Sequence, residues 1–193
     1  MASSSTENMI TLTSSDGEEF VVNEKVAREC HTISNMMLDD CVITNIPLPN
    51  VKSDILSKVI EYCKEHVAAA EKAAAEAEKA AVEAEKAQAE AKPETEKNWI
   101  SSEPVALKAN MDLEEWDKAF MNVDVATLYD LILAANYLNV SGLLALATQT
   151  AANLIIGKSP EQIRKTFHIN NDLSTEEEKA IRDQYPWAFK ESE

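Results

Sequence analysis

The chain has 193 residues, which suits one modest domain with an appendage. Its 34 acidic residues outnumber its 18 basic ones, and the formal net charge is −16. The basic residues are scattered, with no run longer than Arg164-Lys165. We therefore exclude nucleic acid as a partner, because phosphate backbones are bound by clustered Lys and Arg.

The three cysteines, Cys30, Cys41 and Cys63, are far apart and form no Cys-x-x-Cys pair. This usage fits a reducing compartment, in which thiols pack as small apolar groups. No apolar run approaches the roughly 20 residues that a membrane span needs, so we expect no membrane partner. The first residues, MASSSTEN, show no secretory signal. We expect the protein in the nucleus and the cytoplasm.

The first 50 residues predict a small mixed sheet with helices against it. A hairpin is indicated by alternating residues on both sides of Ser14-Ser-Asp-Gly17, where Gly17 supplies the positive φ of the turn. Pro47 places the last strand at a sheet edge or at its own end. The predicted elements are the hairpin strands 10–12 and 19–22, short helices capped by Asn23 and begun by Thr32, and a strand over 42–48.

A longer helix begins at Ser53 and carries one apolar stripe, made of Ile55, Leu56, Val59, Ile60, Cys63 and Val67. From Val67 the sequence becomes rich in alanine and repeats a seven-residue pattern over 69–75, 76–82 and 83–89. We favour a semi-rigid single-helix spacer, because alanine seams bury little surface. A coiled-coil dimerisation rod is the alternative. Lys92-Pro93 is predicted to end the helix, and 94–109 to form a loop.

The second half of the chain predicts helices only. Ser141 is expected to cap one of them and Gly157 to end it in the left-handed conformation. Ser159 and Ser174 each begin a capping box, and Pro186 ends the last helix. The predicted helices cover 112–120, 124–138, 141–156, 159–167 and 174–185.

These helices carry more apolar surface than they can bury among themselves. The helix over 124–138 has one buried face, formed by Leu128, Leu131, Ile132, Ala135 and Leu138, and further apolar side chains at Leu133, Ala134 and Tyr137. The next helix adds a stripe made of Leu143, Leu144, Ala147, Ala151 and Ile155. Ile163, Phe167, Ile169 and the near-terminal Trp187 also need cover. We interpret the region as part core and part docking surface for a helix of another chain.

No pattern in the sequence indicates catalysis. Three histidines and three glycines form no recognisable catalytic frame or phosphate-binding loop. Cys30-His31 are neighbours whose side chains do not face each other on a helix. The acidic run 176–178 lacks the alternating ligands of a calcium loop and suits the start of a helix. We predict no enzyme, no catalytic residue, no cofactor and no metal.

Several long motifs resemble one family. LILAANYLNVSGLL, GKSPEQIRKTFHINNDLSTEEE and Trp187-Ala-Phe resemble the S-phase kinase-associated protein one family, the Skp-one adaptors. SSDGEEFVV, Pro47-Leu-Pro-Asn-Val51 and Trp116-Asp117 agree with it. The alanine-rich spacer and Ile60-Glu-Tyr-Cys63 look like its plant branch. The resemblance covers nearly the whole chain except 67–98.

The resemblance implies an α+β fold, a BTB/POZ-like small mixed sheet with helices, followed by an all-helical extension that binds the F-box motif. The corresponding domains are an N-terminal part of the BTB/POZ-like domain (1–66), a helical spacer insertion (67–98), the remainder of the domain (99–140) and the F-box-binding region (141–193).

The resemblance also implies a function, that of an adaptor joining a cullin to F-box substrate receptors in Skp–cullin–F-box ubiquitin ligases. Asn136 and Tyr137 match positions that the family uses against cullin. The residues expected to face the F-box are Leu143, Leu144, Ala147, Ala151, Ile155, Ile163, Phe167, Ile169 and Trp187. When no F-box partner is bound, the chain could form a weak homodimer.

The chain departs from the family at Ser141, Ala145 and Ile156, where Lys, Asp and Lys are usual. The missing charges imply a narrower choice of F-box proteins or weaker cullin binding. The alternative function, from another class, is a structural BTB homo-oligomer that serves as a scaffold without a ligase.

Overall fold

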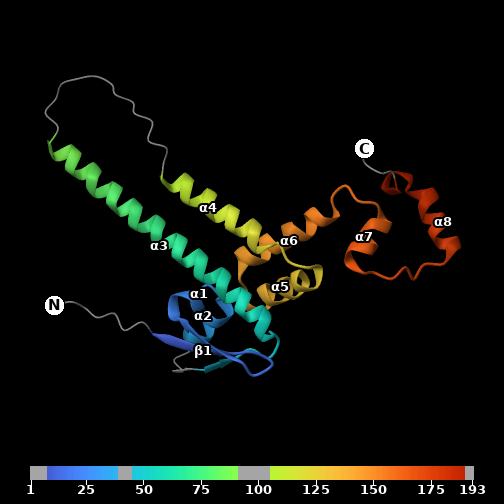
Figure 1. Ribbon diagram of the computed structural model, residues 1–193, viewed down its shortest axis with the longest axis horizontal. Coiled ribbons are helices and arrows are strands. Elements are labelled where there is room, and N and C mark those ends of the chain that lie inside the picture. Colours follow the sequence, from blue (N-terminus) through green and yellow to red (C-terminus); the bar gives the residue numbers. More distant parts are fainter. Residues whose placement is uncertain (1–7, 39–44, 91–104, 190–193) are drawn as a thin grey trace, which may run out of the picture.

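The computed structural model describes residues 8–38, 45–90 and 105–189. Figure 1 shows a small sheet with short helices at one end, a long helix that extends away from it with a second helix alongside, and a separate group of helices at the C-terminal end. The strands are β1 (Met9–Thr13), β2 (Glu19–Asn23) and β3 (Asn45–Pro47). The helices are α1 (Glu24–Arg28), α2 (His31–Leu38), α3 (Ser53–Glu90), α4 (Val105–Phe120), α5 (Val125–Leu138), α6 (Ser141–Ile155), α7 (Pro160–Phe167), α8 (Thr175–Gln184) and the 3₁₀ helix η1 (Pro186–Phe189).

The sheet is mixed, with strand order β2-β1-β3. β1 pairs antiparallel with β2, with Leu12 opposite Phe20, and parallel with β3, with Leu12 opposite Ile46. Alternate residues of β1 are buried, as a strand with one covered face requires. The hairpin and the position of Pro47 at the end of an edge strand confirm the sequence prediction. Residues 42–43, predicted to belong to the same strand, lie outside the described residues.

The hairpin turn also caps the longest helix. Gly17 has φ +84°, as predicted, and lets the turn direct Asp16 toward the first residue of α3. The Ser53 backbone N–H donates to Oδ1 of Asp16 at 3.0 Å, and the Ser53 hydroxyl donates to Oδ2. The hydrogen bond from the Ser14 hydroxyl, followed by those from Ser53, lowers the pKa of Asp16 to about 2. A carboxylate 37 residues away thus accepts from one of the N–H groups at the start of α3 that have no partner within the helix.

Asp16→Asn is expected to lower the melting temperature at pH 7, and the difference from wild type is expected to shrink in acid. The pKa of Asp16 is below its ordinary value of 3.8, so its contribution is present above about pH 4 and is lost as pH falls toward 2. Thermal unfolding followed by circular dichroism between pH 2 and 7 measures this. Asp172→Asn, in the exposed loop before α8, is the control. A pH-independent difference would contradict the prediction.

The core lies where α3 and α5 meet the sheet. Leu12 of β1, Leu56 and Val59 of α3, and Leu131 and Leu138 of α5 are all at most 2% exposed. The predicted stripe on α3 is buried from Ile55 to Cys63, and Val67 is half-buried. Beyond it the helix continues without interruption into the alanine-rich tract as far as Glu90. Lys92 and Pro93 lie outside the described residues.

α4 packs beside α3 through an aromatic cluster. Tyr62 and His66 of α3 stack with ring centroids 3.9 Å apart, and Trp116 and Phe120 of α4 stack at 4.9 Å. His66 Nε2 lies 3.0 Å from a carboxylate oxygen of Asp117. α4 begins at Val105, so the predicted loop is wrong over 105–109. This stretch contains good helix formers without a breaker, and it extends the amphipathic segment that contains Trp116.

α5 ends at Asn139 in the left-handed conformation, with φ 54°, and α6 follows almost directly. Ser141 was predicted to cap α6, but the cap position is Val140, without a side-chain hydrogen bond. Val140 is 3% exposed, and its carbonyl accepts the first helical hydrogen bond from the Leu144 N–H at 3.0 Å, so the helix starts one residue earlier. Gly142, in the first turn, lies against the buried Tyr62. A Cβ at Gly142 would lie 2.7 Å from the Tyr62 hydroxyl oxygen.

Gly142→Ala is expected to lower the free energy of unfolding by about 1 kcal/mol. Overpacking against Tyr62 costs about 1–3 kcal/mol, and the better helix propensity of alanine returns at most about 1 kcal/mol. Tyr62 cannot yield easily, because its ring is held by His66 and Phe120. Urea denaturation measures the change. On a Tyr62→Phe background, which removes the clashing oxygen, the same substitution should be neutral or stabilising. An equal loss on both backgrounds would exclude the clash as the cause.

Candidate functional site

Most of the large apolar side chains that the described chain exposes belong to its last 35 residues. Figure 1 shows α7, α8 and η1 at one end of the molecule, away from the sheet. We define the C-terminal apolar set as the exposed large hydrophobic residues from α6 onward, namely Ile155, Ile156, Ile169, Leu173, Ile181, Tyr185 and Trp187. Neither α7, α8 nor η1 contains a buried residue. Such a concentration of exposed apolar surface is typical of a protein-binding site.

The residues of α6 that were predicted to face the F-box differ in their exposure. Leu143 and Ala147 are 0% exposed and pack in the core, so in this conformation they support the surface from inside. Leu144 and Ala151 are half-buried beside that core, and Ile155 at the end of α6 is 43% exposed. Exposure therefore rises along the stripe, from Leu143 and Ala147 to Ile155 at the end of α6.

An aromatic pair helps to attach α7 to the body of the protein. Phe167 at its last turn meets Tyr129 of α5 edge to face, with centroids 5.9 Å apart. Phe167 and Ile163 are half-buried, and Ile169 beyond the helix is 52% exposed. Tyr129 itself is 47% exposed and was missed by the sequence analysis. Its position outside the buried face of α5 is the signal that could have indicated it.

α8 and η1 complete the set. Trp187 is 74% exposed, the most of any large apolar side chain in the described chain. Ile181 and Tyr185 lie four residues apart at the end of α8 and are 36% and 44% exposed. They were not predicted as site residues, although their spacing places them on one side of the helix, directly before Trp187. An exposed indole gains the burial of its large apolar ring when a partner covers it, provided that its N–H keeps a hydrogen-bond acceptor.

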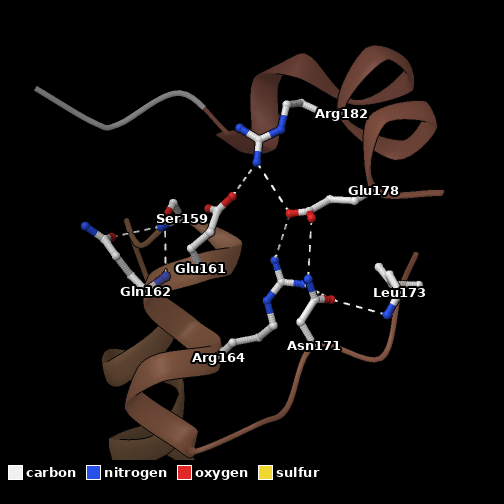
Figure 2. Close-up of polar contacts among 8 residues, drawn as sticks. All are labelled: Ser159, Glu161, Gln162, Arg164, Asn171, Leu173, Glu178 and Arg182. Carbon is white, nitrogen blue, oxygen red and sulfur yellow. Dashed lines mark hydrogen bonds and ion pairs between the residues drawn. The ribbon is translucent and has the colours of Figure 1, made fainter. Parts of the chain in front are cut away.

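Polar contacts join α7 to α8 (Figure 2). Both predicted capping boxes are confirmed, since Ser159 and Ser174 exchange hydrogen bonds with Gln162 and Glu177. Arg182 Nη2 of α8 lies 2.6 Å from Oε1 of Glu161 in the first turn of α7. The pKa of Glu161 is below its ordinary value, mainly because its own backbone N–H donates to the carboxylate, with Ser159 and Arg182 adding to the shift.

The two residues expected to face cullin lie elsewhere. Asn136 is exposed and Tyr137 half-buried at the last turn of α5, beside α2. The hydroxyl of Thr32 in α2 donates to the Tyr137 backbone carbonyl at 2.9 Å and fixes this end of the helix. The 15 residues of α6, about 22 Å at 1.5 Å per residue, separate this position from Ile155. The two predicted surfaces therefore lie apart, one at the end of α5 and the other at and beyond the end of α6.

The described residues contain no cluster of three His, Cys, Asp or Glu side chains that could hold a metal ion. In the same part of the chain, no helix combines the length and apolar character needed to cross a membrane. Cys30 and Cys63 are free and buried, and the hydrogen bond between their thiols, together with burial, raises the pKa of Cys63. The buried thiols behave as the apolar side chains that the sequence predicts.

The small mixed sheet with its helices, followed by an open helical extension, defines an α+β POZ-type domain with an appended protein-binding region. Family models agree with this division. One described as Skp1 family, tetramerisation domain, matches residues 8–68, and one described as Skp1 family, dimerisation domain, matches residues 141–188. The chain is 58% identical to SKP1-like protein 1 of Oryza sativa subsp. japonica over 98% of its own length and 99% of that protein. It is 48% identical to SKP1-like protein 1A of Arabidopsis thaliana, over 93% and 96%.

The chain therefore belongs to the Skp1 family, and the resemblance read from its motifs, including the plant branch, is confirmed. The predicted BTB/POZ-like α+β fold is confirmed as well. Family membership supports an adaptor role in Skp–cullin–F-box ubiquitin ligases rather than an enzymatic one. The roles of the individual site residues stay predictions.

Proposed function

We propose that the protein bridges a cullin to F-box substrate receptors and performs no chemistry itself. The observation that carries the proposal is the C-terminal apolar set, which the folded chain leaves open to solvent. An F-box helix would lie against Ile155, Ile169 and Trp187, and the cullin would lie against Asn136 and Tyr137.

The mechanism in this proposal is geometric. α6 is a single helix that is anchored in the core at Leu143 and Ala147 and open at Ile155. It would hold the two partners at a fixed separation, so that a bound substrate meets the ubiquitin-donating machinery at high effective concentration. Burial of the C-terminal apolar set would supply much of the affinity for the F-box partner.

Reconstitution tests the proposal. The purified chain is mixed with a cullin N-terminal domain and a recombinant F-box domain, and the complexes are analysed by size-exclusion chromatography with light scattering. We expect a 1:1:1 complex, and no association of cullin with the F-box domain when the chain is omitted. Failure of the chain to bind either domain would reject the proposal.

The length of α3 is the one observation that favours the alternative function, a homo-oligomeric scaffold. A helix that extends far beyond the core through its alanine-rich tract is a candidate dimerisation rod. Sedimentation separates the two functions. A dimer that persists at all concentrations and disappears on deletion of residues 67–92 would favour the scaffold, whereas we expect a monomer or a weak homodimer that dissociates when an F-box domain is added.

The proposal includes function in the nucleus and the cytoplasm, which the buried free thiols Cys30 and Cys63 fit. Imaging of a fluorescent fusion tests the location.

The proposal also includes the choice of F-box partners. Ser141, Ala145 and Ile156, where the family usually has charges, are all exposed on or beside α6, and Ile156 is 70% exposed. We propose that this chain serves a subset of F-box proteins, which Ile156→Lys would broaden in pairwise binding assays.

A further inference from the structure

We infer that Arg182 is a positioning residue that holds the Trp187 segment in its binding orientation before a partner arrives. Its guanidinium is the point at which α7, α8 and η1 meet. This inference rests on the proposed function, in which Trp187 faces an F-box protein.

The Arg182 guanidinium contacts residues of three elements. Arg182 Nη2 is 2.6 Å from Glu161 Oε1 on α7 and 3.5 Å from Glu178 Oε1 one turn earlier on α8. Its Cζ lies 4.6 Å from the centre of the Phe189 ring in η1. One side chain therefore contacts three successive elements, and two of them, α8 and η1, flank or contain Trp187.

A second set of contacts, made by Arg164 and Asn171, supports this arrangement (Figure 2). Arg164 of α7 lies 3.5 Å from Glu178 and donates to the Asn171 amide oxygen at 3.0 Å. Asn171 in turn donates to Glu178 at 3.4 Å and accepts from the Leu173 backbone N–H. The loop between α7 and α8 is thus tied to the same carboxylate that Arg182 approaches.

Buried side chains do not provide this support. α7, α8 and η1 have no buried residue, so no apolar core fixes α8 against α7. Isolated exposed ion pairs contribute little, but a network that shares Glu178 and Arg182 restricts the orientation of the whole segment. Preorganisation of a binding segment raises affinity by lowering the entropy lost on association.

The experiment combines a double-mutant cycle with hydrogen exchange, both on the full chain. Dissociation constants for a recombinant F-box domain are measured by calorimetry for wild type, Arg182→Ala, Glu161→Ala and the double variant. We expect each single substitution to weaken binding about five- to tenfold and the double variant to be no weaker than Arg182→Ala. Arg182→Lys, which keeps the charge and loses the planar contact with Phe189, should recover only part of the affinity. Lys179→Ala, on the same helix, is the charge-matched control and should bind like wild type.

Hydrogen exchange of the free chain tests the network without a partner. Amides of 175–189 should exchange faster in Arg182→Ala than in wild type or Lys179→Ala, with 53–66 unchanged. Unaltered exchange in 175–189 would overturn the inference. So would multiplicative losses in the double variant, which would indicate that Arg182 touches the partner directly. A wild-type chain that binds no F-box domain would instead reject the proposed function, and the exchange data would still decide on the network.

Discussion

Trp187→Ala is expected to weaken binding of an F-box domain by about 2 kcal/mol or more, roughly a thirtyfold rise in the dissociation constant. The indole is 74% exposed in the free chain, so its removal costs almost no folding stability and acts on the complex alone. Titration calorimetry measures the affinity, and thermal unfolding of the free variant should agree with wild type within about 0.5 kcal/mol. Unchanged affinity would remove Trp187 from the interface.

Leu38→Ala provides the control for this experiment. Leu38 is 70% exposed, close to the exposure of Trp187, but it ends α2 beside the sheet. If binding of the F-box domain depends on exposed apolar surface at the C-terminal end, Leu38→Ala should leave the affinity at the wild-type value. Equal losses in both variants would point to a general effect of surface hydrophobicity.

Tyr137→Lys is expected to abolish detectable association with a cullin N-terminal domain and to leave F-box binding intact. Tyr137 is half-buried against the core at the end of α5, where a lysine would place a charge in the proposed cullin interface. The hydrogen bond from Thr32 goes to the backbone carbonyl and does not require the ring, so this contact between α2 and α5 should persist. Pull-downs with each partner separately measure the two interactions.

The reciprocal control is Tyr129→Lys on the same helix. Tyr129 is 47% exposed and meets Phe167 of α7, so its substitution should impair F-box binding and spare cullin binding. The same change in residue type at two positions of α5 then gives opposite results. Loss of both partners in either variant would show that the two surfaces are one.

Local signals in the sequence predicted most elements and several of their ends. Gly17, Gly157, Ser159 and Ser174 have the conformations or caps that were expected, because turn and capping chemistry depends on a few adjacent residues. Periodicity also gave the buried stripe at the start of α3. The family motifs supplied the POZ-type fold class, whereas the surplus of apolar residues at helical spacing predicted that the second half is part core and part docking surface.

The rest depends on contacts between residues distant in the sequence. Periodicity placed Leu143 and Ala147 on the same stripe as Ile155, but it could not show that the stripe is fully buried at one end and exposed at the other. The local sequence did not indicate that Val140, and not Ser141, would hold the cap position of α6. The pairing of Arg182 with Glu161, 21 residues earlier, and the approach of Tyr62 to Gly142 are likewise products of the folded arrangement.

The continuity of α3 has a consequence for how this chain can vary in length. The seven-residue unit of its alanine-rich tract is about 10 Å long and spans nearly two full turns. Gain or loss of one unit would therefore shift the far end along the axis while rotating it by only about 20°. Such changes leave the buried part of α3, from Ser53 to Cys63, in place. The length of the helix beyond the core can therefore change in steps of about 10 Å without altering the packing of the domain.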